Sequence, residues 1–156
     1  MNDDLEMRLG RVKLLALDLD GVLTDGGLWY GNHGDEIKRF DIHDGFGVVL
    51  LGRGGIPTVI VSGKKSRVNE RRAKELGVAG LYQNVTRKDV VVEKILKRLK
   101  LSWENVCFVG DDVIDLPVMK RAGVAVAVSD AVGEVLKAAH YVTHNRGGHG
   151  AVREVT

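Results

Sequence analysis

Three aspartates follow a short apolar run near the start of the chain, and their types and spacing could do chemistry. Residues 12–17 have the length and composition of a buried strand, and Asp18 and Asp20 come where that strand would end. Ligands of open α/β sheets bind outside the carboxyl ends of the strands. Two carboxylates this close together are costly unless something positive lies near them. The pair therefore predicts a bound cation or a lysine, whereas Asp25 is interpreted as a turn residue.

Polar residues also follow three later apolar runs. They are Ser62 and Gly63 after 58–61, Lys88 after 81–82, and Asp111 and Asp112, with Asp115 close behind, after 106–109. If the strands are parallel, all of these residues converge on one edge of the sheet. Carboxylates from two strands can hold a hard cation such as Mg²⁺. A lysine, a hydroxyl and a glycine amide can bind phosphoryl oxygens, so the pattern predicts a site for a phosphate ester.

The chemistry that such a site could perform is hydrolysis in two steps. One aspartate can take the phosphoryl group as an aspartyl-phosphate. A second can protonate the departing alkoxide and later take a proton from water. Each residue alone has a structural interpretation, because Ser62 could cap a helix, Lys88 could be a surface lysine, and Asp111 could face a helix N-terminus. Their common position after successive strands favours catalysis.

The elements that must position these residues are predicted from hydrophobic periodicity. Strands are expected at 12–17, 58–61, 81–82, 106–109, 124–128 and 141–142, with helices between them. Asp44 is predicted to cap the first helix and Ser66 the second, with Pro117 in the first turn of a later one. We expect an α/β protein with a three-layer α/β/α parallel sheet. It forms one domain, 1–156, with a β-hairpin at about 27–41 and a glycine-rich tail at about 143–156.

Composition narrows the class of protein. The 156 residues carry a formal net charge of +2, which is too small to suggest a nucleic-acid partner. No apolar run approaches the roughly 20 residues that a membrane span needs, and the acidic start is not typical of a signal peptide. Cys107 is the only cysteine and lies in an apolar run, so it is predicted to be a core residue. A cytoplasmic location fits these features.

The motifs together resemble those of the haloacid dehalogenase-like phosphatase superfamily. The resemblance rests on DLDGVLTD at 18–25, SGK at 62–64, Lys88, and GDDVID at 110–115, and it spans nearly the whole chain. It implies a Rossmann-like fold in which Asp18 is the nucleophile and Asp20 the general acid and base. It further implies Mg²⁺ held by Asp18, the Asp20 carbonyl and Asp111. Asp112 or Asp115 would support the metal, and Ser62, Gly63 and Lys88 would bind the phosphoryl group.

Two further segments, 40–47 and 147–154, are similar to the capless sugar-acid phosphatases of that superfamily. The enzymes that hydrolyse 3-deoxy-D-manno-octulosonate 8-phosphate are the type case, and this compound, a precursor in lipopolysaccharide synthesis, is the first expected substrate. A nine-carbon keto-sugar acid 9-phosphate is the alternative. The resemblance also implies a homotetramer in which hairpins associate and the tail of one subunit closes a neighbouring active site.

Two positions depart from that pattern. Lys64 and His149 stand where such relatives more often carry arginine, and a lysine is a point charge rather than a bidentate fork. The basic segment that runs from Lys64 to Arg72 is either a solvated helix face or a contact for the phosphorylated substrate. Lys64, Arg72 and His149 are therefore the candidates for substrate binding.

Other classes of protein fit the sequence less well. A phosphoacceptor signalling domain would place an adjacent acidic pair after the first strand, whereas here that pair, Asp111 and Asp112, comes late. A non-catalytic binding subunit would be favoured if Asp18 or Asp20 were missing, and both are present. A dinucleotide-binding enzyme is disfavoured because Gly45 and Gly47 lack the third glycine of that motif.

Overall fold

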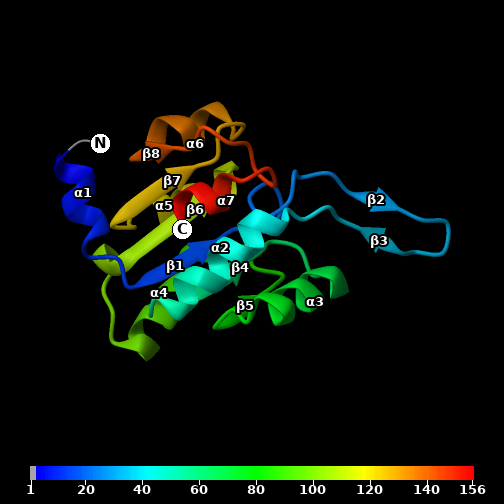
Figure 1. Cartoon of the computed structure of the whole chain (residues 1–156), viewed down its shortest axis with the longest axis horizontal. Coiled ribbons are helices and arrows are strands. Elements are labelled where there is room, and N and C mark those ends of the chain that lie inside the picture. The colour runs from blue at the N-terminus through cyan, green and yellow to red at the C-terminus, as the bar shows by residue number, and fades with distance from the viewer. Residues whose placement is uncertain (1–2) are drawn as a thin grey trace.

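The computed structural model describes residues 3–156 and is built on a six-stranded sheet whose strand pairs are all parallel (Figure 1). The strand order is β5 (Gly80–Tyr82), β4 (Thr58–Val61), β1 (Leu14–Leu17), β6 (Val106–Gly110), β7 (Val124–Ala127) and β8 (Tyr141–Val142). Every residue of β1, β4, β6 and β7 is buried, as expected for a parallel sheet covered on both faces. The strands begin and end within two residues of the predicted positions.

Helices flank both faces of the sheet, which confirms the predicted three-layer α/β/α architecture. They are α1 (Asp3–Leu9), α2 (Ile42–Arg53), α3 (Arg67–Leu76), α4 (Lys88–Leu99), α5 (Leu116–Met119), α6 (Gly133–Ala138) and α7 (Ala151–Val155), with short 3₁₀ turns at Trp103–Asn105 and Val113–Asp115. Helices α2 and α7 pack against each other in front of the sheet in Figure 1. Helices α4, α5 and α6 form a second group that packs on β4, β6 and β7. No helix in the described part of the chain is long and apolar enough to cross a membrane.

The N-terminus of α2 differs from the prediction. Asp41, not Asp44, is the N-cap, and its side chain accepts hydrogen bonds from the backbone N–H groups of His43 and Asp44. Asp44 lies in the first turn and is fully buried. The tail covers it, and its carboxylate accepts hydrogen bonds there from the N–H groups of Gly150 and Arg153. The prediction for Ser66 is confirmed, since it caps α3.

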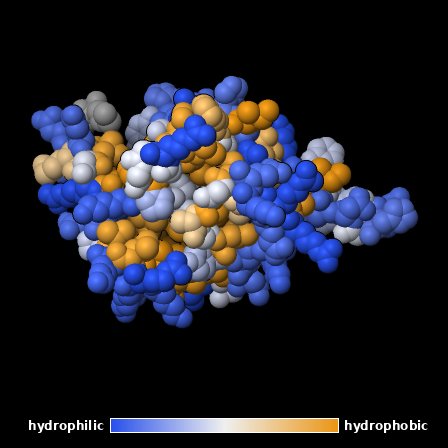
Figure 2. Space-filling view, turned by 60° about the horizontal axis from the view of Figure 1, so that its bottom comes forward, coloured by the Kyte–Doolittle hydropathy of each residue, from blue (hydrophilic) through white to orange (hydrophobic). Residues whose placement is uncertain are grey.

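The hairpin is a separate two-stranded sheet that projects from the body of the molecule (Figure 1). Its strands are β2 (Trp29–Tyr30) and β3 (Glu36–Ile37), within the predicted hairpin at about 27–41, and a bridge between Thr24 and Phe40 closes its base. Figure 2 shows a hydrophilic tip on this projection. Nearer the body, Trp29 is 67% exposed, so the hairpin carries apolar surface that this chain does not cover.

The glycine-rich tail packs on its own chain. Gly148 donates a backbone hydrogen bond to Val22, and a Cβ at Gly147 would overlap the carbonyl of Gly21. Glu154 organises the turn before α7, because it accepts hydrogen bonds from the Tyr141 hydroxyl and from the amides after β8. Burial opposes the charge of Glu154, but these hydrogen bonds outweigh it and lower the pKa of Glu154 to about 2.

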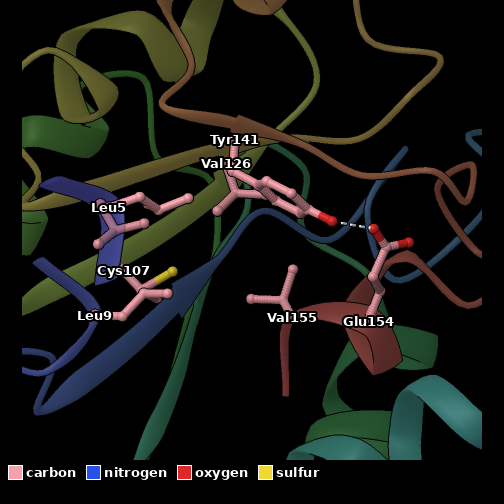
Figure 3. Close-up of a pocket in the computed structure, with 8 residues that line it drawn as sticks. Leu5, Leu9, Cys107, Val126, Tyr141, Glu154 and Val155 are labelled. Atoms are coloured by element: carbon pink, nitrogen blue, oxygen red, sulfur yellow. Dashed lines mark hydrogen bonds between the residues drawn. The ribbon is translucent and has the colours of Figure 1, made fainter. Parts of the chain in front are cut away.

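An apolar cavity of about 160 Å³ lies under α1, a helix that the periodicity analysis did not predict (Figure 3). Leu5 and Leu9 of α1 face Cys107 and Val126 of the sheet across it, and the Tyr141–Glu154 hydrogen bond lies at its edge. Burial raises the pKa of the Cys107 thiol to about 12, so this cysteine is a neutral core residue, as predicted.

Candidate active site

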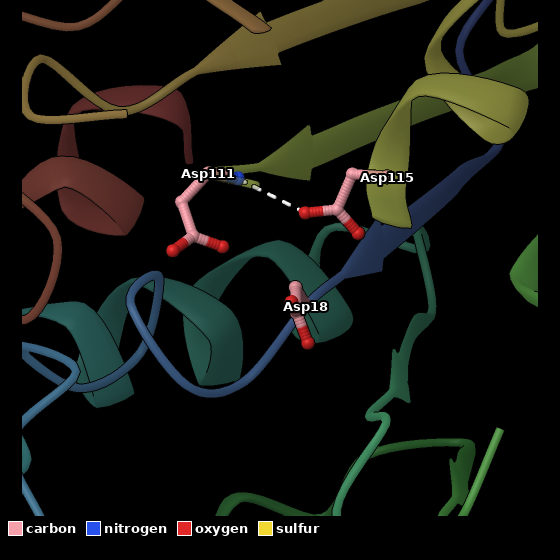
Figure 4. A group of neighbouring side chains, drawn as sticks. All are labelled: Asp18, Asp111 and Asp115. Carbon is pink, nitrogen blue, oxygen red and sulfur yellow. Dashed lines mark hydrogen bonds between the residues drawn. The ribbon is translucent and has the colours of Figure 1, made fainter. Parts of the chain in front are cut away.

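The carboxyl ends of three adjacent central strands bring the predicted site residues together. Asp18 directly follows β1, Ser62 follows β4 and Asp111 follows β6, while Lys88 is the first residue of α4. Lys88 Nζ lies 2.6 Å from Asp18 Oδ2 and 2.7 Å from Asp115 Oδ1. Figure 4 shows Asp18, Asp111 and Asp115 around one space. Lys88, Asp18 and Asp115 form one buried ionic cluster, and the partly buried Asp111 lies beside it.

Lys88 is fully buried and nevertheless charged. Burial by itself disfavours the ammonium, but attraction to Asp18 and Asp115 outweighs this effect and raises the pKa of Lys88. The lysine therefore offers a fixed positive charge directly beside Asp18. Such a charge could attract a phosphoryl group to the neighbouring carboxylate.

Three aspartates could hold a metal ion. One carboxylate oxygen from each of Asp18, Asp111 and Asp115 lies within 4.8 Å of the others. Asp111 Oδ1 is buried without a hydrogen-bond partner, and a buried oxygen of this kind needs a proton or a cation. Asp115 Oδ2 is already bound by the N–H of Asp111. An all-oxygen donor set with a free buried oxygen fits Mg²⁺.

The electrostatics of this cluster match that interpretation. Burial, reinforced by the charge of Asp115, raises the pKa of Asp18 to about 6, although Lys88 opposes the rise. Burial, with the charges of Asp18 and Asp115, raises the pKa of Asp111 to about 8. Asp18 is therefore largely ionised at pH 7, as a nucleophile must be, whereas Asp111 becomes an effective anion only when a positive group comes close.

Asp20 contacts a lysine that sequence reasoning missed. Lys38, which follows β3, places its Nζ 2.6 Å from Asp20 Oδ1 and 2.9 Å from Asn69 Oδ1. No local sequence pattern indicates this contact, because Asp20 and Lys38 are 18 positions apart in the chain. The alternation of side chains along a strand predicts only that Glu36 and Lys38 lie on the same side of the hairpin, where Lys38 Nζ is 3.4 Å from Glu36 Oε1.

The other members of the predicted phosphate and metal sets have local hydrogen-bond partners. The Ser62 hydroxyl is buried, accepts from the N–H of Lys64 at 3.2 Å and donates to its carbonyl oxygen at 3.1 Å. Gly63 follows Ser62 and is the second residue after the end of β4. The Asp112 side chain accepts a hydrogen bond from the N–H of Val113, and so it caps the short turn there rather than joining the cluster of Asp18.

The three candidates for substrate binding lie in different surroundings. Lys64 Nζ is 2.9 Å from Glu36 Oε2 and 2.7 Å from the Tyr30 hydroxyl, so it is bound to the hairpin. The Arg72 guanidinium donates to the carbonyl of Asp41 at 3.1 Å, next to the start of α2.

His149 faces a cavity of about 460 Å³ between the hairpin base and the tail, which Trp29 and Arg146 also line. Sequence reasoning missed Arg39, whose guanidinium donates to the Gly148 carbonyl at 2.6 Å and lies 3.3 Å from the His149 ring. A positive charge therefore stands beside the histidine.

Comparisons with known proteins show which family this chain resembles. Residues 73–155 match the family model described as haloacid dehalogenase-like hydrolase. A 3-deoxy-D-manno-octulosonate 8-phosphate phosphatase from Yersinia pestis is 43% identical over 153 residues, which cover 98% of this chain and 82% of that protein.

Solved structures agree as well. A crystal structure of the Yersinia pestis phosphatase aligns with a TM-score of 0.97 at 42% identity, covering 99% of this chain and 84% of that one. A Moraxella catarrhalis 3-deoxy-D-manno-octulosonate 8-phosphate phosphatase, in complex with a magnesium ion, a phosphate ion and KDO, also aligns with a TM-score of 0.97. That pair is 34% identical and the alignment covers 99% of this chain and 89% of that one. The chain therefore belongs to the haloacid dehalogenase-like hydrolase family.

Proposed function

We propose that this protein is a Mg²⁺-dependent phosphatase that hydrolyses 3-deoxy-D-manno-octulosonate 8-phosphate to the free sugar acid and phosphate. The observation that carries the proposal is the buried Asp18 carboxylate, held by the Lys88 ammonium at 2.6 Å and grouped with Asp111 and Asp115. The names of the relatives supply the substrate, because the Yersinia pestis and Moraxella catarrhalis proteins are phosphatases of this compound.

In the first step Asp18 attacks the phosphorus atom of the substrate. A new bond forms between the Asp18 carboxylate oxygen and phosphorus, while the bond from phosphorus to the sugar oxygen breaks. Asp20 gives its proton to that departing oxygen, which leaves an aspartyl-phosphate on Asp18 and the free sugar acid. Lys88 holds the charge of the phosphoryl oxygens beside Asp18 throughout.

In the second step a water molecule attacks the aspartyl-phosphate. Asp20, now a carboxylate, takes a proton from the water, and the bond between phosphorus and Asp18 breaks to release inorganic phosphate. Asp18 and Asp111 would hold Mg²⁺ together with the Asp20 carbonyl, and Asp115 would support them. When bound there, the ion supplies positive charge that neutralises the phosphoryl oxygens. Ser62 and Gly63 would bind the same oxygens once the substrate displaces the local hydrogen bonds of the serine.

The proposed recognition of the sugar acid involves the cavity between the hairpin base and the tail. His149 and Arg146 line that cavity, and Arg39 lies 3.3 Å from the His149 ring, so the Arg146 guanidinium is the group that a substrate carboxylate would meet there. Asp25 and Asp130 also line the cavity, and Arg146 would have to leave Asp130 to bind the substrate. Lys64 and Arg72 are the remaining candidates, and each would have to leave its present partner, Glu36 or the Asp41 carbonyl, to reach the substrate.

A phosphate-release assay over a panel of phosphorylated sugars and keto-sugar acids tests the function. We expect 3-deoxy-D-manno-octulosonate 8-phosphate to give the highest kcat/KM, no release after chelation of Mg²⁺, and no turnover by Asp18→Asn, which should keep the fold. Preference for a nine-carbon keto-sugar acid 9-phosphate would shift the substrate assignment. Normal turnover by Asp18→Asn would refute the nucleophile.

We further propose that the protein is a cytoplasmic homotetramer in which the hairpins associate and the tail of one subunit borders a neighbouring active site. Trp29 and Ile37, which are 67% and 58% exposed on the hairpin, support the proposal, because apolar surface of this kind favours association. Light scattering at micromolar concentration should give four times the subunit mass. A monomer would exclude any role for a neighbouring tail.

A further inference from the structure

Lys38 is a buried lysine at the edge of the active site, and neither step of the proposed reaction gives it a role. Its side chain is fully buried, and its Nζ is held by three oxygens: Asp20 Oδ1 at 2.6 Å, Asn69 Oδ1 at 2.9 Å and Glu36 Oε1 at 3.4 Å. Burying an ammonium costs free energy unless charged and hydrogen-bonding partners surround it. These three oxygens therefore stabilise the buried Lys38 ammonium and fix its position.

Two of the three partners are fixed without any help from Asp20. Asn69 is buried in α3 and its amide donates to Gln83 Oε1 at 3.1 Å. Glu36 is held from its other side by Lys64, whose Nζ lies 2.9 Å from Glu36 Oε2. The position of the Lys38 ammonium is thus set by the hairpin and α3, and Asp20 is the partner that it can orient.

The orientation matters because the two oxygens of Asp20 are no longer equivalent. An ammonium has three donors and no acceptor, so the oxygen that binds it is a poor place for a proton. With Oδ1 bound to Lys38, the proton that Asp20 exchanges belongs on Oδ2. A general acid must lie within hydrogen-bond reach of the oxygen that it protonates, and a misplacement of about 1 Å can cost about 100-fold in rate.

We propose that Lys38 is the positioning residue of the general acid and base: it binds Asp20 Oδ1 and thereby presents Oδ2 to the leaving group and to the attacking water. This inference rests on the proposed phosphatase function. It also gives the hairpin a part in catalysis, because Glu36 and Lys38 both come from its second strand or directly after it.

The test compares substrates that do and do not need an acid. The sugar phosphate has an alkoxide leaving group that must be protonated, whereas p-nitrophenolate leaves without a proton. In Lys38→Met, kcat for the sugar phosphate should fall about 10- to 100-fold, since general acid–base catalysis contributes roughly 10²–10⁴-fold. The first turnover of p-nitrophenyl phosphate should stay within about threefold of wild type, followed by slow release, because hydrolysis of the aspartyl-phosphate still needs Asp20 as a base.

A double-mutant cycle separates positioning from a general structural effect. Adding Lys38→Met to Asp20→Asn should lower kcat by less than about twofold further, because a residue that acts through Asp20 has nothing left to act on. Lys38→Arg should recover part of kcat. Lys74→Met, an exposed lysine of α3, is the matched control and should behave like wild type.

Three results would overturn the inference: wild-type kcat in Lys38→Met, equal losses for both substrates in the first turnover, or losses that add to those of Asp20→Asn. Circular dichroism shows whether Lys38→Met folds. If it does not, Lys38→Gln, which also removes the positive charge, replaces it in the same experiments. Failure of the proposed function would look different, because the wild-type protein itself would then release no phosphate from either substrate.

Discussion

Replacing Lys88 with methionine removes the only cation that contacts the cluster of Asp18 and Asp115 in the described part of the chain. Lys88 and Asp115 are both fully buried, and methionine fills a similar volume without charge. Breaking a buried ion pair by removing one partner costs about 3–5 kcal/mol, because the other charge is left uncompensated. We therefore expect the free energy of unfolding at pH 8 to fall by that amount.

The loss should shrink as the pH falls. Lys88 lowers the pKa of Asp18 and of Asp111, which are about 6 and about 8 with the lysine present. Without the lysine these carboxyls bind protons at a higher pH in the folded protein, and each additional proton bound contributes about 1.4 kcal/mol per pH unit as the pH decreases. Between pH 8 and pH 5.5 the variant should recover on the order of 1–2 kcal/mol relative to wild type.

The assay is urea unfolding followed by circular dichroism at pH 8 and pH 5.5, with chelator present. Lys97→Met is the matched control on the same helix, because Lys97 is exposed and lies 3.6 Å from Glu93, and we expect a loss below about 0.5 kcal/mol. A Lys88→Met protein within about 1 kcal/mol of wild type at pH 8 would refute the reasoning. A loss of unfolding free energy that is the same at both pH values would refute the expected effect of Lys88 on the pKa values of Asp18 and Asp111.

Three other predictions test separate parts of the structure. Binding of Mg²⁺ at pH 7 should release close to one proton, because Asp111, with a pKa of about 8, is about 90% protonated before the ion binds. Calorimetry in two buffers of different ionisation enthalpy measures the number of protons released, and a value of zero would contradict the prediction. Glu154 contributes stability above its unfolded pKa of about 4.5 that is lost as the pH falls towards its folded pKa of about 2. Solvent screens part of this interaction, so Glu154→Gln should be less stable by about 1–2 kcal/mol at pH 7, and urea unfolding should show the difference shrink between pH 4.5 and pH 2. Gly147→Ala places a methyl group against the Gly21 carbonyl and should cost about 1–3 kcal/mol, whereas Gly133→Ala, with open space around it at the start of α6, should be at least as stable as wild type.

Local sequence patterns were sufficient for the sheet. Short apolar runs bounded by glycine and polar residues predict strands wherever they occur, and the ends of β1, β4 and β6 fix where Asp18, Ser62 and Asp111 emerge. Because parallel strands end at the same edge of a sheet, the convergence of these residues follows from the parallel arrangement, and the structure adds that β4, β1 and β6 are neighbours. Such patterns are weaker where an element is short or lacks a buried face, and this is why α1, which has no buried residue, was not predicted.

Contacts between distant segments were beyond local patterns. Asp44 has the sequence context of a helix cap, but the tail supplies two N–H donors to its carboxylate, so Asp41 caps α2 instead. The sequence around Lys38 predicts only a residue of an alternating strand. The position of its ammonium depends on Asn69, which is 31 positions away in the chain.

The sequence by itself determined the α/β class, the parallel sheet and the set of acidic, basic and hydroxyl side chains at its carboxyl edge. Hydrophobic burial along each strand is a short-range property, and the periodicity of the residues records it. Only the tertiary structure decided which charges meet: Lys88 with Asp18 and Asp115, and Lys38 with Asp20. Electrostatic energy in a buried site depends on separations of a few ångströms between side chains that are far apart in the chain, and no local pattern encodes those separations.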